Sequence, residues 1–252
     1  MVQAIFVSVL LWGQAHAQVT PSATVTALLD RTLEVGASVT AGKNPVRIPA
    51  RIDSPGQRLT ARYGTEANLS RYGKDGSASD ASMTRVPATE WAKKTMILAI
   101  DLFFWDSRND AQACTDSVDR VTEFADLMKK NNLAWVIGTV PDMTDGKVVR
   151  ISQPCRDALN TAILAACAAD SVCYLADFFS MRAKFKADGG IQYKGKHYSF
   201  FELQPDGLHL SPVASEHVVD QIQSRLEGNL EPFVFKGTHC GYFEGQGPTC
   251  TL

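Results

Sequence analysis

The sequence lacks an excess of charge of either sign. Its 25 Lys and Arg residues nearly balance 27 Asp and Glu residues, which leaves a formal net charge of −2 over 252 residues. Proteins that bind nucleic acids usually carry a basic face, so this balance argues against a nucleic-acid partner. Internal repeats and low-complexity tracts are also absent, and nothing in the composition indicates a second domain.

Long apolar runs are absent outside the N-terminus. The run from Ala4 to Trp12 is too short to span a bilayer. The first 17 residues contain no Lys, Arg, Asp or Glu, and Ala15-His16-Ala17 matches the small-x-small pattern of signal-peptide cleavage. We therefore expect residues 1–17 to be a signal peptide cleaved near Ala17. Residues 18–252 would then form one secreted or periplasmic domain with no stable membrane insertion.

Common metal motifs are missing as well. Neither a C-x-x-C pair nor an H-E-x-x-H motif occurs, so we expect no metal site and no cofactor. The six cysteines form an even set, which in an exported protein indicates disulfides. Proximity along the chain favours Cys167–Cys173 and Cys240–Cys250, and leaves Cys114–Cys155 as the third pair. The Gly-rich tail, residues 227–252, would be pinned by Cys240–Cys250.

Apolar segments typical of strands alternate with amphipathic segments typical of helices. Strands are predicted at Thr32–Val35, Thr95–Ile100, Leu133–Val140 and Val172–Phe178, and helices at Ser117–Lys130, Cys155–Ala169 and Pro212–Leu226. Residues 43–90 are predicted as loop with one helix or a short strand at most, and Asp188–Leu203 as a hairpin around Lys194-Gly195. Strands separated by such helices form a parallel sheet covered on both faces. The fold class is therefore α/β, a three-layer α/β/α sandwich.

One short segment near the C-terminal end carries the strongest chemical signal. In Pro205-Asp206-Gly207-Leu208-His209-Leu210-Ser211-Pro212 a carboxylate precedes a histidine by three residues, and Ser211 and Pro212 are typical of a helix start. A histidine oriented by a carboxylate is the base that a serine nucleophile needs. Taken alone, His209 is more typical of an ordinary surface or capping residue.

A candidate nucleophile lies far upstream. Ser38 follows the first predicted strand, between Gly36 and Gly42, although the spacing is not that of a G-x-S-x-G elbow. Such a serine can also simply cap a helix. Sites in parallel sheets lie beyond the carboxyl ends of the strands. Both Ser38 and His209 are expected at that edge, and their combination with Asp206 favours a catalytic triad.

These motifs resemble those of the SGNH (GDSL-type) hydrolase family. Gly36-Ala37-Ser38 stands where that family has Gly-Asp-Ser, and Asp206-Gly207-Leu208-His209 matches its D-x-x-H block. The resemblance runs from about Leu33 to Leu226. It implies a flavodoxin-like fold and a site without metal, in which Ser38 is the nucleophile, His209 the base and Asp206 its orienting partner. Ala37 departs from the family's aspartate at a position that is not the nucleophile.

The blocks that supply oxyanion donors in that family match less well. Besides the Ser38 amide, Gly76 is similar to the glycine whose amide binds the oxyanion, and Gly73 is the alternative. Asn109, in Ser107-Arg108-Asn109-Asp110, is a weak candidate, because it lies several residues further along the chain than the position expected for the family's G-x-N-D block. Two functions stay open. One is an exported serine esterase for lipid, acetylated-carbohydrate or short acyl esters. The other is a catalytically weak relative that binds a glycan or lipid.

Aromatic residues near these motifs allow two interpretations each. Leu102-Phe103-Phe104-Trp105 either packs the core at a strand end or forms the wall of an acyl pocket. The aromatic residues of the hairpin either form a substrate rim or pack the hairpin onto the domain; they are Tyr193, Tyr198, Phe200 and Phe201. The histidines without a carboxylate three residues earlier are predicted to be structural or solvated; they are His197, His217 and His239.

Overall fold

The computed structural model describes residues 22–46, 51–143, 149 and 151–228, and the backbone of residues 239–243 and 246–251. The predicted signal peptide, residues 1–17, lies outside this range. Five parallel strands form the central sheet, in the order β2-β1-β3-β4-β5. Their bounds are β1 Thr32–Gly36, β2 Ser70–Gly73, β3 Met96–Ala99, β4 Ala134–Gly138 and β5 Cys173–Ala176.

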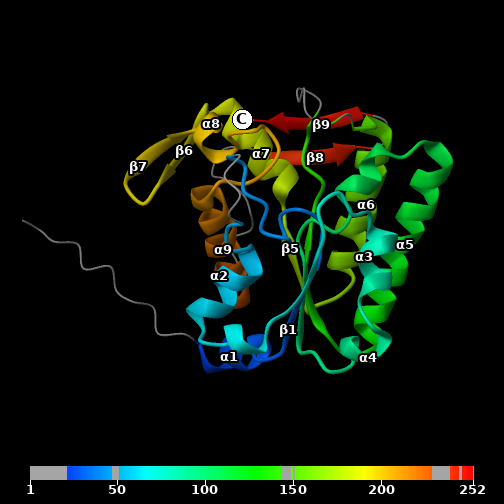
Figure 1. The fold of residues 1–252 in the computed structure, drawn as a ribbon. Helices are drawn as coiled ribbons and strands as arrows, with labels where there is room; N and C mark the ends of the chain where they lie inside the picture. Colours follow the sequence, from blue (N-terminus) through cyan, green and yellow to red (C-terminus); the bar gives the residue numbers. More distant parts are fainter. Residues whose placement is uncertain are drawn as a thin grey trace, which may run out of the picture.

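Helices cover both faces of this sheet (Figure 1). One face carries α1 (Ala23–Leu29), α2 (Pro55–Arg62), α7 (Phe178–Ala187) and α9 (Pro212–Leu226). The other carries α3 (Ser79–Arg85), α4 (Ala88–Trp91), α5 (Ala111–Lys130) and α6 (Gln153–Ala168). Short 3-10 turns lie at η1 (Glu66–Asn68) and η2 (Trp105–Arg108). The predicted three-layer α/β/α architecture is confirmed.

The central strands are buried on both faces, and their side chains alternate between two cores. Ile97 packs in a cluster with Phe124 of α5. Its neighbour Leu98 packs on the opposite face with Val218 and Ile222 of α9. Successive side chains of a strand point to opposite faces, so a run that is apolar throughout fits only between two helix layers.

Residues 43–90 contain more helices and strands than the sequence predicted, so that prediction was wrong. This stretch contains α2, α3, α4 and the edge strand β2, which pairs with β1 from Leu33↔Ser70 to Gly36↔Gly73. Strand β2 is only partly buried, so it has no apolar run to reveal it. Helix α7 was not expected either. The strand predicted to reach Phe178 ends at Ala176, because the Asp177 carboxylate caps α7 by accepting from the Ser180 amide at 3.2 Å.

The predicted hairpin and final helix are confirmed. Strands β6 (Gly190–Tyr193) and β7 (Lys196–Ser199) pair antiparallel, and α8 (Phe200–Leu203) follows them. The connecting residues Lys194 and Gly195 have φ values of 49° and 79°, as a two-residue turn of this kind requires. Helix α9 begins at Pro212, and the Ser211 hydroxyl accepts from the Ala214 amide at 3.3 Å.

Two of the three predicted disulfides are present. Cys114–Cys155 joins α5 to α6, and Cys167–Cys173 joins the end of α6 to β5. Strands β8 (His239–Phe243) and β9 (Gln246–Thr251) pair antiparallel with Cys240 opposite Cys250. The side chains of that third pair lie outside the described residues.

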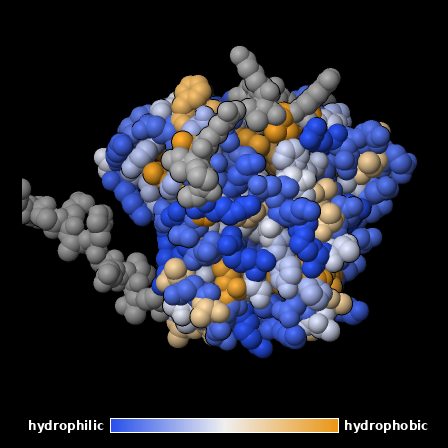
Figure 2. All heavy atoms as spheres, in the orientation of Figure 1, coloured by the Kyte–Doolittle hydropathy of each residue, from blue (hydrophilic) through white to orange (hydrophobic). Residues whose placement is uncertain are grey.

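One face of the molecule is mainly polar. Hydrophilic residues cover most of the face seen in Figure 2. Within the described ranges, no helix combines the length and the apolar character needed to cross a bilayer.

Candidate active site

Ser38 lies in a tight turn directly after β1. The turn is closed by bonds from the Ala41 amide to the Ala37 carbonyl at 2.9 Å and from the Lys43 amide to the Ser38 carbonyl at 2.9 Å. Ser38 is only 4% exposed. The turn stands at the carboxyl end of the central sheet, where the sequence placed the nucleophile.

A carboxylate from the neighbouring strand holds this turn. Asp101 follows β3, and its Oδ1 accepts from the Ala37 amide at 2.9 Å and from the Thr40 hydroxyl at 2.6 Å. Its Oδ2 accepts from the Val39 amide at 2.7 Å. The amides on both sides of Ser38 are therefore fixed by one side chain.

Sequence reasoning missed Asp101. Burial raises the pKa of its carboxyl group, although the hydrogen bonds from Thr40, Ala37 and Val39 act in the opposite direction. A single acidic residue directly after a buried strand was a usable signal, because the carboxyl ends of adjacent parallel strands meet at one edge. Ala37 stands where the SGNH family has an aspartate. The carboxylate that reaches the turn here is that of Asp101, two residues beyond the end of β3.

Asp206 and His209 form the pair that the sequence predicted. His209 Nδ1 lies 2.6 Å from Asp206 Oδ2. Asp206 Oδ1 accepts from the backbone amides of Leu208 and His209 at 2.9 and 2.7 Å. Burial acts to raise the pKa of Asp206, but the hydrogen bonds from His209 and Leu208 outweigh it and hold the pKa below its usual value. With Nδ1 engaged, Nε2 is the ring nitrogen left to accept a proton.

One cavity brings the two segments together. Ser38 forms part of its wall, as do Leu208 and Leu210 on either side of His209. His209 itself is 5% exposed. Within the described ranges, no hydrogen bond joins Ser38 directly to His209, which lies between the two lining residues Leu208 and Leu210. Catalytic hydrogen bonds are often long before substrate binds.

The candidate oxyanion donors lie in different surroundings. The loop after β2 adjoins the end of β1, because the Lys74 amide donates to the Gly36 carbonyl at 3.2 Å. Gly73 packs so closely on the Ser38 turn that a Cβ atom there would lie 2.5 Å from the Ala41 nitrogen. Gly76 adopts φ +70° in the turn that the Ser77 amide closes onto the Lys74 carbonyl at 3.2 Å. Such a φ value favours glycine.

The side-chain amide of Asn109 is bound to helix α5. Its Nδ2 donates to the Ser117 hydroxyl at 2.9 Å and to the Ala113 carbonyl at 3.3 Å, both in α5. Asn109 therefore supports the start of α5, and it is not part of the cavity wall.

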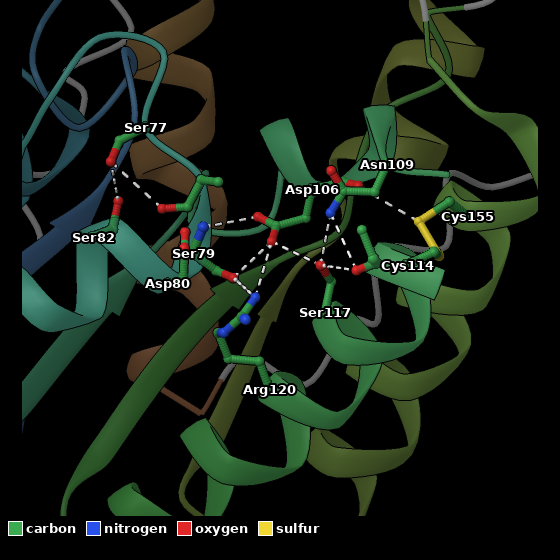
Figure 3. A network of polar contacts seen from close by, with 12 residues as sticks. Ser77, Ser79, Asp80, Ser82, Asp106, Asn109, Cys114, Ser117, Arg120 and Cys155 are labelled. Atoms are coloured by element: carbon green, nitrogen blue, oxygen red, sulfur yellow. Dashed lines mark hydrogen bonds and ion pairs between the residues drawn. A yellow bond between two sulfur atoms is a disulfide. The ribbon is translucent and has the colours of Figure 1, made fainter. Parts of the chain in front are cut away.

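Asn109 belongs to a polar network centred on Asp106 (Figure 3). Asp106 is buried and accepts from the amide and hydroxyl of Ser79, both at 2.8 Å, and from the Ser117 hydroxyl at 3.0 Å. Arg120 lies 3.4 Å from the same carboxylate. Ala78 offers no capping side chain to α3, so Asp106 supplies the missing acceptor from η2. This network joins three helical segments.

Both predicted roles of the aromatic run after β3, core packing and a cavity wall, occur in the structure. Leu102 and Phe103 are fully buried in the core, whereas Phe104 also lines the cavity. The hairpin residues Tyr193, Tyr198 and Phe200 pack against the core on the α9 side. Phe201 is 76% exposed.

Neither His197 nor His217 lines the cavity beside Ser38. His217 is partly buried and its ring contacts those of Phe185 and Tyr193; desolvation by this partial burial lowers its pKa. His197 is exposed, and His239 lies outside the residues whose side chains are described. No group of three or more His, Cys, Asp or Glu side chains suited to a metal ion occurs in the part of the chain that the structure describes.

Comparison with known proteins gives matches in three dimensions only. No protein-family model and no curated protein matches the sequence. Among solved structures, a lipase/acylhydrolase from Enterococcus faecalis is similar with a TM-score of 0.54 and 18% identity. The match covers 80% of this chain and 97% of that one. A GDSL-like lipase from Bacteroides thetaiotaomicron is similar with a TM-score of 0.51 and 14% identity. That match covers 80% of this chain and 90% of the lipase chain.

The chain has the SGNH hydrolase fold. Two further SGNH-fold matches cover almost the whole of the other chain. The psychrotrophic esterase EstA from a Pseudoalteromonas species matches with a TM-score of 0.51 at 15% identity. The match covers 80% of this chain and 98% of the EstA chain. The acetyl xylan esterase AlAXEase matches with a TM-score of 0.54 at 16% identity. The match covers 77% of this chain and 98% of the AlAXEase chain. The SGNH resemblance inferred from two short motifs is confirmed at the level of fold.

Proposed function

We propose that this protein is an exported serine hydrolase that cleaves carboxylic esters. The observation that carries the proposal is the Asp206–His209 pair, at 2.6 Å, in a segment that borders the same cavity as Ser38. A nucleophile, a base and an orienting carboxylate around one cavity are the parts that acyl transfer needs.

In the proposed reaction His209 takes up and returns a proton twice, once in acylation and once in deacylation. His209 Nε2 takes the proton from the Ser38 hydroxyl as Oγ attacks the ester carbonyl. The imidazolium then gives this proton to the departing alcohol, which leaves an acyl group on Ser38. Water, deprotonated by His209, attacks the acyl-enzyme; the bond between the acyl carbon and Ser38 Oγ breaks, the carboxylic acid is released, and His209 returns the proton to Oγ. Asp206 keeps the ring oriented and stabilises its positive charge.

The amides of Ser38 and Gly76 are the proposed donors to the oxyanion, with Gly73 as the alternative to Gly76. Asn109 is left out of this set, because its side-chain amide is engaged in α5. Loss of one oxyanion donor lowers the rate of acyl transfer by about 10²–10³. The engagement of Asn109 with α5 therefore supports a second candidate function, that of a catalytically weak protein that binds a glycan or lipid.

Similar folds with esterase activity support the reaction class. The matched structures include a lipase/acylhydrolase, an acetyl xylan esterase and an esterase inhibited by monoethylphosphonate. A phosphonate mimics the tetrahedral geometry of ester hydrolysis and can bond to a nucleophilic serine, so the same chemistry suits a test on this protein.

The test is covalent labelling with a fluorophosphonate probe. The wild-type protein should be labelled on the peptide that contains Ser38, and Ser38→Ala should lose both labelling and ester hydrolysis. Ser215→Ala is the matched control, because Ser215 is also buried and its hydroxyl has no partner among the described residues. This control should be labelled like the wild type. A folded Ser38→Ala protein that still hydrolyses esters, or an adduct on another serine, would overturn the proposal.

Export is proposed from residues 1–17 and is supported by the two disulfides. The N-terminus of the protein recovered after export should be Gln18. Intact mass should show no alkylation of cysteine before reduction. An uncleaved N-terminus, or cysteines that react without reduction, would contradict this part of the proposal.

A further inference from the structure

The cavity beside Ser38 has walls that are largely apolar. Ser38 contributes the nucleophile candidate at one side. The apolar side chains come from α7, from the segment after β3 and from the Asp206–His209 segment. The main ones are Phe104, Phe178, Met181, Phe185, Leu208 and Leu210. Ligand cavities of this kind bind apolar groups and use a few polar atoms for orientation.

The polar side chains in the wall are already hydrogen-bonded to the protein. Thr139 donates to Asp177 Oδ1 at 2.9 Å and accepts from the Phe179 amide at 2.9 Å. Arg182 donates from Nε to Gln204 Oε1 at 3.0 Å, and Gln204 donates to the Leu208 carbonyl at 3.2 Å.

The carboxylate of Asp101 is occupied by the nucleophile turn. Of the polar side chains that line this cavity, Ser38 alone therefore has no hydrogen bond through its side chain within the described ranges. A sugar ring would bring several hydroxyl groups into the cavity and find few partners, and polar groups left unpaired against an apolar wall oppose binding. An alkyl or aryl group loses nothing there and gains from leaving water.

We infer that this cavity holds the acyl part of the ester, and that the preferred acyl group is apolar and longer than acetyl. The inference rests on the proposed function of Ser38. The alcohol leaves first, and the attacking water must follow the path that the alcohol vacates. The apolar cavity therefore suits the group that stays bound to Ser38, and the alcohol part faces the solvent side.

The test compares two ester series on the full chain. In the first series, 4-nitrophenyl acetate, butanoate, hexanoate and octanoate vary the acyl part. In the second, alkyl acetates of increasing length vary the alcohol part. Burial of one methylene favours binding by about fourfold, so kcat/KM should rise at least about tenfold from acetate to hexanoate. A flat acyl series, or a rise only in the alcohol series, would overturn the inference while leaving ester hydrolysis intact.

Met181 provides a variant that reports on the cavity itself. Met181→Ala enlarges the cavity and should move the preferred acyl length upward by two or more carbons. Met128→Ala is the matched control, because Met128 is equally buried but lies in the core under α5. Both changes should lower the melting temperature, yet Met128→Ala should keep the wild-type chain-length profile. The same profile shift in both variants would contradict the assignment of the cavity.

Binding to Ser38→Ala separates this inference from the proposed function. The variant cannot form an acyl-enzyme, so calorimetry reports affinity without turnover. It should bind 4-nitrophenyl octanoate at least about tenfold more tightly than the acetate. Equal affinities would overturn the cavity assignment whatever the wild type hydrolyses. Tight binding of the octanoate, together with a wild type that hydrolyses no ester, would refute the hydrolase and retain the apolar cavity.

Discussion

Asp101 Oδ1 lies where a side chain on Gly36 would begin. A Cβ atom built on Gly36 would be 2.2 Å from that oxygen, a distance that no real contact of this kind tolerates. The same oxygen accepts hydrogen bonds from Ala37 and Thr40. Gly36 therefore leaves the space through which a carboxylate from β3 reaches the turn of Ser38.

Asp101→Asn should reduce kcat far more than it changes KM. The variant places an NH₂ group where the carboxylate accepts from backbone amides or a hydroxyl, so at least one donor of the turn loses its acceptor. We expect a loss of about 1–3 kcal/mol in the free energy of unfolding and a fall in kcat of about tenfold or more, because a small displacement of a reacting group is costly. Steady-state kinetics and denaturant titration measure both quantities.

Asp106→Asn is the control for that experiment. Asp106 is also buried and also accepts from a backbone amide and from hydroxyls, but its partners are Ser79 and Ser117. It should lose comparable stability and keep kcat within about threefold, because the Gly76 turn is closed by its own Ser77–Lys74 hydrogen bond. Equal losses of kcat in the two variants would show that Asp101 acts through general stability alone.

Asp206→Asn should separate folding from chemistry. The amide oxygen can still accept from the Leu208 and His209 backbone, so the melting temperature should change little. The amide NH₂ now faces Nδ1 and favours the ring tautomer with the proton on Nε2, which cannot accept the Ser38 proton. We expect kcat to fall by about 10²–10⁴. A folded variant with full activity would remove Asp206 from the proposed triad.

Glu34 should make stability depend on pH. It is fully buried in β1, where it accepts from the Ser54 hydroxyl at 2.5 Å and the Gly56 amide at 2.9 Å. Burial raises its pKa from the usual 4.5 to about 7, although Ser54, Gly56 and the Arg71 charge act to lower it. Between these two pH values the folded chain holds a proton that the unfolded chain has lost, so stability falls as the pH rises.

Glu34→Gln tests this assignment. The free energy of unfolding of the wild type should drop between pH 5 and pH 8 by about 2–3 kcal/mol more than that of the variant. Urea titrations of both proteins at the two pH values give the difference, in which the contributions of other groups cancel. Parallel pH profiles would show that Glu34 titrates normally.

The two disulfides should differ in their effect on stability. Cys114–Cys155 spans 41 residues of sequence, whereas Cys167–Cys173 spans 6. On loop-closure entropy, replacing the first pair by alanine should cost about 4 kcal/mol and the second about 2 kcal/mol. Denaturant unfolding of the two double variants measures this. The opposite order would mean that contacts in the native state, and not loop length, set the contribution of each bond.

The sequence by itself determined the layers of this protein and two residues of its candidate site. Buried strands such as Met96–Ala99 and amphipathic helices such as Pro212–Leu226 carry their periodicity in the chain. Asp206 and His209 are three residues apart, so local backbone geometry is enough to pair them. These features depend on neighbours along the chain, and a single sequence contains them.

Only the tertiary structure decided what reaches Ser38. Asp101 lies more than sixty residues away in sequence, and its contact with the turn depends on β3 lying beside β1. Edge strand β2 and helix α7 have no distinctive local pattern, yet β2 borders the Ser38 turn and α7 forms much of the apolar wall of the cavity. Asn109 had the right residue type but pairs with α5. Contacts between distant segments arise from sheet order and packing, which local propensity does not specify.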